Sequence, residues 1–305
     1  MNNPDWNLYR TLLAVLQTGS LSAAARKLGL TQPTVGRHVD ELEAALGYPL
    51  FTRSQQGLMP TEAALALQPY AQTLSSTVAA LLREASGTLG AVDGVVRISA
   101  SDIIGIEVLA PILAKLQAEH PHLIIELSLS DTVEDLLRRE ADIAVRMTEP
   151  RQDALVARHI GDIELGLHAQ RDYLERNGYP ADLAALAHHR MIGFDRETAF
   201  IRASLDHIRR VAPDFPTDIT RSYRCDSNLA QLSAIRAGAG IGICQVKLAA
   251  RDQGLVRLLP EFSLPLETWV AMHENLKQSR RCRTVFDALC KGLLEYTRGR
   301  PDHQL

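Results

Sequence analysis

Long hydrophobic runs are absent from this chain of 305 residues. No apolar stretch approaches the roughly 18 to 20 residues that a membrane-spanning helix needs, so we expect no membrane contact. The first residues, MNNPDWNLYR, also lack the basic and then apolar plan of a secretion signal. With 46% hydrophobic residues, 23% charged residues and a formal net charge of −3, the composition predicts a soluble, cytoplasmic protein of two or more domains.

Metal-binding and catalytic motifs are also absent. The four cysteines form no C-x-x-C pair, and we expect them to be reduced (Cys225, Cys244, Cys282 and Cys290). There is no G-x-S-x-G or H-E-x-x-H motif, and the adjacent His188 and His189 would point apart in any regular structure. The glycine cluster at 238–242 ends an expected helix and enters a strand, whereas phosphate loops open a helix. We therefore expect no active site, no metal and no cofactor.

The most informative segment is 20–62, where apolar spacing predicts two helices joined by a short turn. The first has four apolar residues at helical spacing before a glycine stop signal (Leu21, Ala24, Ala25 and Leu28, then Gly29). Thr31 is a good N-cap for the second helix, and Pro33 suits its first turn. The buried stripe of that helix repeats at intervals of four, three and four until Gly47 ends it (Val35, Val39, Leu42 and Leu46).

Hydrogen-bonding side chains lie outside this stripe near the start of the second helix (Gln32, Thr34, Arg37 and His38). A helix pair of this kind, with polar side chains at the start of its second helix, fits the major groove of DNA. Upstream, Asp5 can cap a further helix that packs beneath the pair. The segment therefore predicts a DNA-binding helix-turn-helix followed by a wing.

These motifs resemble the LysR-type transcriptional regulators. The resemblance is carried by QTGSLSAAARKLGL, TQPTVGRHVDELEAALGYPLF and TRSQQGLMPTEA, and it extends more loosely over the whole chain. It implies a multidomain fold: an N-terminal all-α winged helix-turn-helix at 1–60, a long linker and dimerisation helix at 61–89, and a C-terminal α/β effector-binding domain at 90–305. That domain would consist of two doubly wound subdomains, as in periplasmic binding proteins.

The resemblance also implies which residues contact DNA. Residues of the second helix would contact bases or nearby phosphates (Gln32, Pro33, Thr34, Arg37 and His38). Residues of the wing would contact the DNA backbone or the minor groove (Arg53, Gln55 and Gln56). Chemically, Arg37 can pair with guanine and Gln32 with adenine, whereas Arg53 supplies charge. A solvated helix face is the alternative for Arg37 and His38.

One departure from the family concerns charge in the DNA-binding region. Residues 1–60 contain five basic and four acidic residues, so their net charge is only +1 (Arg10, Arg26, Lys27, Arg37 and Arg53; Asp5, Asp40, Glu41 and Glu43). Counterion release supplies most sequence-independent DNA affinity. We therefore expect weak non-specific binding and dependence on dimer symmetry and specific contacts.

A long helix capped by Thr61 should follow the wing and run to about Leu89. Its apolar residues have heptad spacing over two to three heptads, although Pro69 should perturb its first turns (Leu67, Ala71, Leu74, Val78 and Leu81). Dimerisation through this helix would place two recognition helices about 10 bp apart on dyad-related half-sites. Packing of the helix on its own domain is the alternative. A small-residue linker follows at 86–94.

Residues 95–147 alternate as strand, helix, strand, helix and strand, with the helices near 104–119 and 132–139. Later strands are expected at 163–169, 190–195, 222–225, 240–245, 255–259 and 267–272, with helices at 228–238 and 279–297. The resemblance implies one lobe from 92–162 and 267–300, a second lobe from 163–266, crossover strands between them, and an effector cleft.

Ligands of open parallel sheets bind beyond the carboxyl ends of the strands. The polar and aromatic residues expected there are Ser101, Asp102, Ser130, Asp131, Thr132, Arg146, Phe194, Asp195, Asp226, Ser227 and Asn228. Helix N-termini and the guanidinium of Arg146 attract negative charge, which favours a small organic acid as the effector. The aspartates would repel such an acid if they point inward, so an amine-bearing or neutral effector is the alternative. Helix capping is the alternative role for Ser101, Thr132 and Ser227. Some relatives sense oxidants through cysteine, but burial is the default for Cys225.

The sequence thus predicts a ligand-responsive transcriptional regulator, not an enzyme. Its expected partners are double-stranded promoter DNA, a small-molecule effector, further copies of itself as a dimer or tetramer, and RNA polymerase. The alternative is a cytosolic α/β solute-binding protein or enzyme whose N-terminal helices serve only for assembly.

Overall fold

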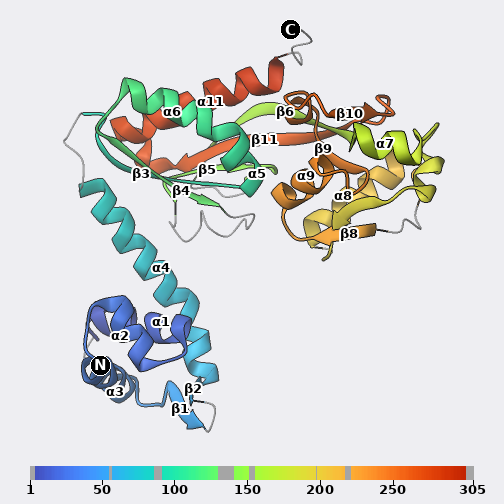
Figure 1. The fold of residues 1–305 in the computed structure, drawn as a ribbon. Helices are drawn as coiled ribbons and strands as arrows, with labels where there is room; N and C mark the ends of the chain where they lie inside the picture. Colours follow the sequence, from blue (N-terminus) through green and yellow to red (C-terminus); the bar gives the residue numbers. More distant parts are fainter. Residues whose placement is uncertain are drawn as a thin grey trace. The chain divides into compact units, whose positions relative to one another are not determined.

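The computed structural model describes residues 4–54, 57–85, 91–129, 141–150, 155–196, 198–216 and 221–299. The chain divides into two compact units, and among the described residues the first ends at 85 and the second begins at 91 (Figure 1). Within these ranges no helix is both long and apolar enough to cross a membrane. The expected helix at 132–139 lies outside the described residues.

The first unit begins with three short helices whose ends are set by local capping. They are α1 (Trp6–Thr18), α2 (Leu21–Leu28) and α3 (Gln32–Leu46). Asp5 and Thr31 cap α1 and α3 through their side chains, as the sequence predicts. A glycine in the left-handed conformation follows each helix (Gly19, Gly29 and Gly47). The apolar faces of the three helices pack together into a small core.

A two-stranded wing and a long helix complete the first unit. The wing pairs β1 (Phe51–Ser54) with β2 (Gly57–Pro60) in antiparallel fashion. Helix α4 (Glu62–Ala85) follows, and Thr61 caps it by accepting a hydrogen bond from the backbone N–H of Ala64 at 3.2 Å. Pro69 lies inside this helix, which continues through it rather than being interrupted there.

The second unit is organised around a mixed seven-stranded sheet with the strand order β10-β6-β11-β5-β3-β4, and β9 also pairs with β6. Its strands are β3 (Gly94–Ala100), β4 (Leu123–Leu129), β5 (Ile143–Arg146), β6 (Leu155–Gln170), β9 (Gly242–Gln245), β10 (Leu255–Leu258) and β11 (Leu264–His273). The long antiparallel pair β6 and β11 runs from one lobe into the other (Figure 1). The predicted lobe boundaries fall inside these two crossover strands.

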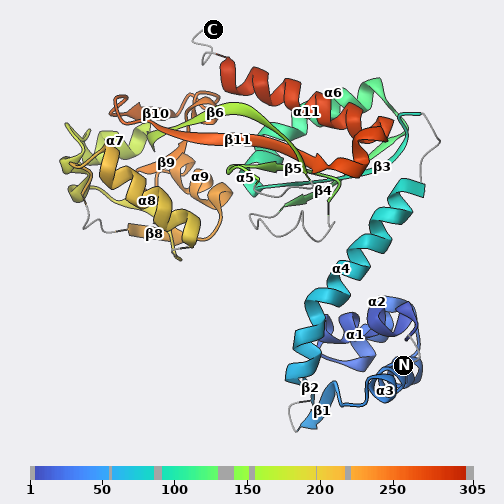
Figure 2. The same cartoon turned by 180° about the vertical axis from the view of Figure 1, so that it is seen from behind.

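The first lobe covers its parallel strands with helices. These are α5 (Asp102–Ile104), the π-helical turn η1 (Gly105–Leu109), α6 (Ala110–Glu119) and α11 (Arg280–Arg298), preceded by the 3₁₀ turn η4 (Glu274–Gln278). Figures 1 and 2 show α6 and α11 lying side by side. The helix expected at 104–119 is present as one uninterrupted helical run over 102–119, which contains the π-helical turn η1. Gly105 lets this turn pack closely on β4, because a Cβ there would lie 2.4 Å from the side chain of Leu129.

The second lobe contains a small parallel sheet of β7 (Met191–Phe194) and β8 (Arg221–Cys225). Around it lie α7 (Arg171–Asn177), the 3₁₀ turn η3 (Ala184–His188), α8 (Ala199–Val211), α9 (Asn228–Arg236) and α10 (Val246–Ala249). The glycine cluster does join the end of α9 to β9, as expected. One large apolar core includes residues of both lobes, so the hydrophobic core continues along the crossover strands from one lobe into the other.

Candidate nucleic-acid interface and effector site

The exposed start of α3 presents the side chains that the sequence assigns to base recognition. Thr31 accepts a hydrogen bond from the backbone N–H of Thr34 at 3.4 Å, and the two hydroxyls lie 2.8 Å apart. Gln32 and Arg37 are exposed and have no hydrogen-bond or ion-pair partner within the described part of the chain. Their donors and acceptors are therefore available to an external partner. Pro33 is exposed beside them.

His38 is held from below by the first helix. Its Nδ1 lies 2.9 Å from the hydroxyl of the buried Thr11, and that hydroxyl donates to the backbone oxygen of Asn7 at 2.8 Å. The Thr11 hydroxyl thus lies within hydrogen-bond distance of both the Asn7 carbonyl and Nδ1 of His38. The half-buried ring is therefore fixed in one orientation, with Nε2 left for another partner.

The wing is tied to α3 through an acidic residue. One carboxylate oxygen of Glu43 accepts hydrogen bonds from the backbone N–H groups of Leu50 at 2.6 Å and Phe51 at 3.0 Å. One of the acidic residues that distinguish this helix from more basic family members thus serves to place the wing. The backbone of Arg53 belongs to β1, but its side chain and residues 55–56 lie outside what the structure describes.

Arg10 is a basic residue that sequence reasoning counted but assigned no role. With Thr34 and His38 it lines a hollow of about 470 Å³ between the start of α1 and the face of α3. Its position next to two of the predicted DNA-contact residues makes it a further cation of this surface. The place of Arg10 beside α3 depends on how α1 packs on α3, and no local sequence pattern shows that packing.

The structure brings together three of the predicted effector-site residues from the two lobes. Ser227, the N-cap of α9, accepts a hydrogen bond from the backbone N–H of Ala230 at 3.3 Å. Its own hydroxyl donates to a carboxylate oxygen of Asp102 at 2.5 Å. Beside Asp102, the buried hydroxyl oxygen of Ser101 has no hydrogen-bond partner among the described residues. This group therefore contains an acceptor carboxylate and an unused hydroxyl.

Other predicted effector residues cluster at the carboxyl ends of β7 and β8. Phe194 pairs with Cys225 in register, and Asp226 and Asn228 follow directly, with Asp226 exposed. The exposed Asp195 forms an ion pair with Arg196 at 3.6 Å. These side chains share one edge of the second lobe.

Arg146 does not extend freely toward that edge. It is 6% exposed, and its guanidinium donates to the backbone oxygen of Ser99 at 3.2 Å and to the Ser99 hydroxyl at 2.9 Å. A further bond joins it to the backbone oxygen of Val145 at 3.0 Å. The guanidinium thus links β5 to β3 through hydrogen bonds. Ser130, Asp131 and Thr132 lie outside the described residues.

Sequence reasoning missed a second link between the lobes. Glu107 of η1 forms an ion pair with Arg236 of α9 at 3.0 Å, and its backbone oxygen accepts from Arg251 at 2.8 Å. No local pattern signals pairs that lie more than a hundred residues apart in the chain.

Burial keeps two of the cysteines from forming thiolates. Burial raises the pKa of Cys244 to about 12 and that of Cys290 to about 11, so both thiols stay protonated at neutral pH. The half-buried Cys225 donates weakly to the backbone oxygen of Ser227 at 3.4 Å. No group of three or more metal-ligating side chains is found in the described ranges.

A winged helix-turn-helix with a free polar recognition face, followed by a two-lobed α/β unit, defines a ligand-responsive DNA-binding transcriptional regulator. Comparisons with known proteins agree. Residues 6–65 match the model for bacterial regulatory helix-turn-helix proteins of the lysR family, and residues 89–293 match the LysR substrate binding domain. The chain belongs to the LysR family of transcriptional regulators.

Individual relatives match most of this chain. The HTH-type transcriptional regulator CrgA of Neisseria meningitidis serogroup B is 32% identical over 247 residues, covering 81% of each chain. The HTH-type transcriptional activator TtdR of Escherichia coli is 24% identical over 299 residues, covering 96% of this chain and 94% of its own.

Two solved structures share the fold. The structure of CrgA from Neisseria meningitidis matches with a TM-score of 0.58 at 24% identity, covering 96% of this chain and 99% of that one. Full-length CbnR in complex with its target DNA matches with a TM-score of 0.68 at 19% identity, covering 94% of this chain and 99% of that one.

Proposed function

We propose that this regulator, acting in the cytoplasm, binds a dyad-related promoter site as an oligomer. The observation that carries this proposal is the free, exposed pair Gln32 and Arg37 at the start of α3, beside the anchored ring of His38. Arg37 can donate two hydrogen bonds to guanine, and Gln32 can pair with adenine. Pro33 and Thr34 lie within the same turn, and Arg53, Gln55 and Gln56 of the wing would meet the DNA backbone.

Helix α4 offers the surface for dimerisation. Three large apolar side chains are exposed along one side of it: Tyr70 at 71%, Leu74 at 45% and Leu81 at 64%. Their spacing of four and seven residues places them on a single helical face. Of the other predicted heptad residues, Ala71 is buried and Leu67 packs on the core of its own unit. The half-buried Val78 lies on the same helical face as Leu74 and Leu81, so these three predicted heptad residues, with Tyr70, would form the dimer face. A tetramer would form from two such dimers.

The effector would bind where Ser101, Asp102 and Ser227 meet. The carboxylate of Asp102 is the hydrogen-bond acceptor of this group, and the guanidinium of Arg146 is bound to Ser99 of β3. An incoming carboxylate would be repelled by Asp102, whereas an amine or hydroxyl could donate to it. Of the two alternatives that the sequence left open, the geometry favours an amine-bearing or neutral effector over an organic acid.

Regulation would follow from a change in the contact between the lobes. An effector that takes the place of Ser227 at Asp102 binds one arrangement of the lobes better than another, and this difference shifts the equilibrium between them. The shift would change how effector domains pack in the oligomer, and hence the spacing of the DNA-reading units and the access of RNA polymerase to the promoter.

The test is a titration of the DNA upstream of the protein's own gene with wild-type protein, Gln32→Ala and Arg37→Ala. Each substitution should weaken specific binding by roughly tenfold or more, because a good bidentate base contact is worth about 1–3 kcal/mol. Arg283→Ala, which removes an exposed arginine from α11 in the second unit, is the charge-matched control. Equal affinities for all four proteins would contradict the proposal.

A further inference from the structure

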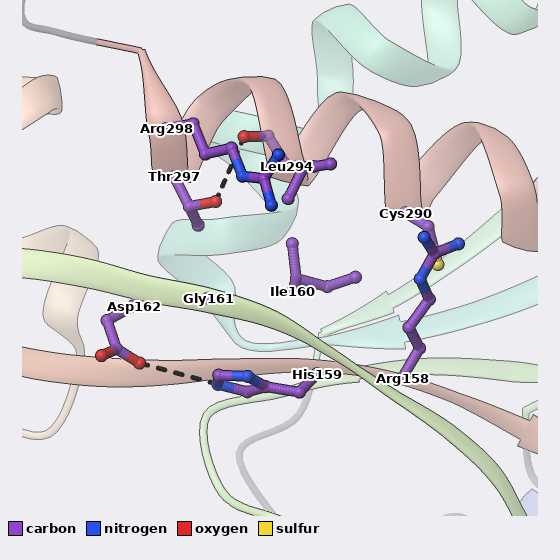
Figure 3. A pocket seen from close by; sticks show the side chains of 9 residues that line it. All are labelled: Arg158, His159, Ile160, Gly161, Asp162, Cys290, Leu294, Thr297 and Arg298. Atoms are coloured by element: carbon purple, nitrogen blue, oxygen red, sulfur yellow. Dashed lines mark hydrogen bonds and ion pairs between the residues drawn. The ribbon is translucent and has the colours of Figure 1, made fainter.

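A cavity of about 380 Å³ lies between the crossover strand β6 and the last turns of α11 (Figure 3). Its lining is Arg158, His159, Ile160, Gly161, Asp162, Cys290, Leu294, Thr297 and Arg298. None of these residues is among those predicted to contact DNA or the effector. A volume of this size falls within the range of pockets that hold small organic molecules, about 300–1,000 Å³.

The floor of the cavity is built by a bulge in β6. The pairing with β11 shifts register between Thr268 and Trp269, which leaves Ile160 as the extra residue on β6. Gly161 follows with a φ of 131°, a conformation that side chains disfavour. The normal alternation of a strand is thereby broken, so five consecutive residues of β6 line the cavity. Bulges re-aim side chains in this way beside binding sites.

The charged residues of the cavity leave an excess of positive charge. His159 and Asp162 lie 3.7 Å apart, so the one carboxylate of the lining faces the imidazole. Arg158 and Arg298 are exposed, and within the described ranges neither forms an ion pair with a carboxylate. Burial raises the pKa of the Cys290 thiol to about 11, against a smaller lowering by Arg158, so the thiol adds no negative charge.

Apolar groups complete the lining. Ile160 is buried, and Leu294 of α11 is half-buried above it (Figure 3). The cavity therefore combines two guanidinium groups with a hydrocarbon wall. Guanidinium groups bind carboxylates through paired charge-assisted hydrogen bonds, and a hydrocarbon wall favours an apolar body on the same ligand.

We propose that this cavity is a second ligand site, which takes a small organic anion with a carboxylate on an apolar body. Arg158 and Arg298 hold the carboxylate, and Ile160 and Leu294 contact the apolar part. The site is independent of the proposed contact between Asp102 and Ser227, since it shares no residue with it.

Trp269 provides a direct reporter for the test. Its ring lies 4.8 Å from the ring of His159, and the only other tryptophan of the sequence is Trp6 in the first unit. In a Trp6→Phe background, emission therefore comes from beside the cavity alone. Hexanoate serves as the probe, hexanamide as its uncharged counterpart, and inorganic phosphate as an anion without an apolar body.

Hexanoate should change the emission of Trp269 saturably, and its dissociation constant should rise roughly tenfold in Arg158→Ala and in Arg298→Ala. Arg283→Ala, on the same helix but outside the lining, should leave the constant unchanged. The proposal is overturned by no saturable change with hexanoate, or by equal constants in all variants. Binding of hexanamide or phosphate as tight as that of hexanoate would also overturn it.

Discussion

The carboxylate of Glu43 in the recognition helix accepts a hydrogen bond from the backbone N–H of Leu50 at 2.6 Å, at the point where the chain enters the wing. The same oxygen also accepts from Phe51 at 3.0 Å. Two backbone donors thus converge on a single ionised acceptor. This carboxylate thus fixes the start of the wing on α3, together with the buried packing of Leu50 and Leu42.

We therefore expect Glu43→Ala to weaken DNA binding without removing any DNA contact. The free energy of unfolding should fall by about 1–3 kcal/mol, because two backbone donors lose a charged acceptor. The matched control is Asp40→Ala, which removes the same charge from an exposed position of the same helix. It should strengthen binding slightly through reduced phosphate repulsion. A gain in affinity for both variants, measured by fluorescence anisotropy, would contradict the structural role of Glu43.

Dimerisation through α4 predicts that Leu81→Glu produces a monomer. Leu81 is 64% exposed on the same face as Tyr70 and Leu74, and a buried carboxylate there would be costly. Leu82 is equally accessible at 62% but lies about 100° around the helix, so Leu82→Glu is the matched control. Analytical ultracentrifugation should show dissociation for the first variant alone. Dissociation of both, or of neither, would rule out this face.

The contact between Ser227 and Asp102 predicts an energetic coupling between the lobes. Ser227→Ala removes both the cap of α9 and the hydrogen bond between the lobes. Asp102→Ala removes that hydrogen bond together with the local one that the Asp102 carboxylate accepts from the backbone N–H of Ile103 at 2.6 Å. In a double-mutant cycle by urea unfolding, the coupling energy should be about 1.5–3 kcal/mol, as for a hydrogen bond to a charged group. Strictly additive effects would show that the two side chains do not interact in solution.

His168 predicts a loss of stability in acid. It is 2% exposed, and burial lowers its pKa from 6.5 to about 4, while the Gly166 carbonyl opposes this shift. Between these two pH values the unfolded chain binds a proton that the folded chain does not. The free energy of unfolding therefore falls as the pH drops through this window, by about 3 kcal/mol in total.

The comparison for this prediction is His168→Gln, which cannot titrate. Urea unfolding at pH 7 and pH 4 should show a smaller loss of stability for this variant than for the wild type. Equal losses would mean that His168 is protonated in the folded protein as readily as in the unfolded chain.

The first unit could be predicted almost completely from the sequence because its signals are local. Asp5, Thr31 and Gly47 act within a few residues of the helix ends that they define. The exposed polar face at the start of α3 follows from helical spacing, whereas its assignment to DNA contact came from the family resemblance. The role of Glu43 could not be predicted, since its partners lie seven and eight residues away across a turn.

In the second unit the sequence predicted most strands but missed the helices α7, α8 and α10 and the contacts between the lobes. Helix α8 did have a local signal, since Thr198 caps it and Ile201, Leu205 and Ile208 follow at helical spacing. Strand β6 was predicted too short because its bulge breaks the alternation of buried side chains.

The long-range contacts have no such signal. Ser227 and Asp102 are 125 residues apart, and either one alone has the properties of an ordinary helix cap. Their meeting depends on how the crossover strands place the two lobes. Sequence reasoning could therefore assign both residues to a ligand-binding edge but could not show that they contact each other.

The most direct test of DNA reading by α3 is a hydroxyl-radical footprint of the wild-type protein on the DNA upstream of its own gene, across a salt series. With a net charge of only +1 in residues 1–60, specific contacts must carry the binding. We predict two dyad-related protected segments, with half-sites about 10 bp apart, that persist at moderate salt. Diffuse protection that disappears as salt rises, and that occurs equally on unrelated fragments, would contradict this account.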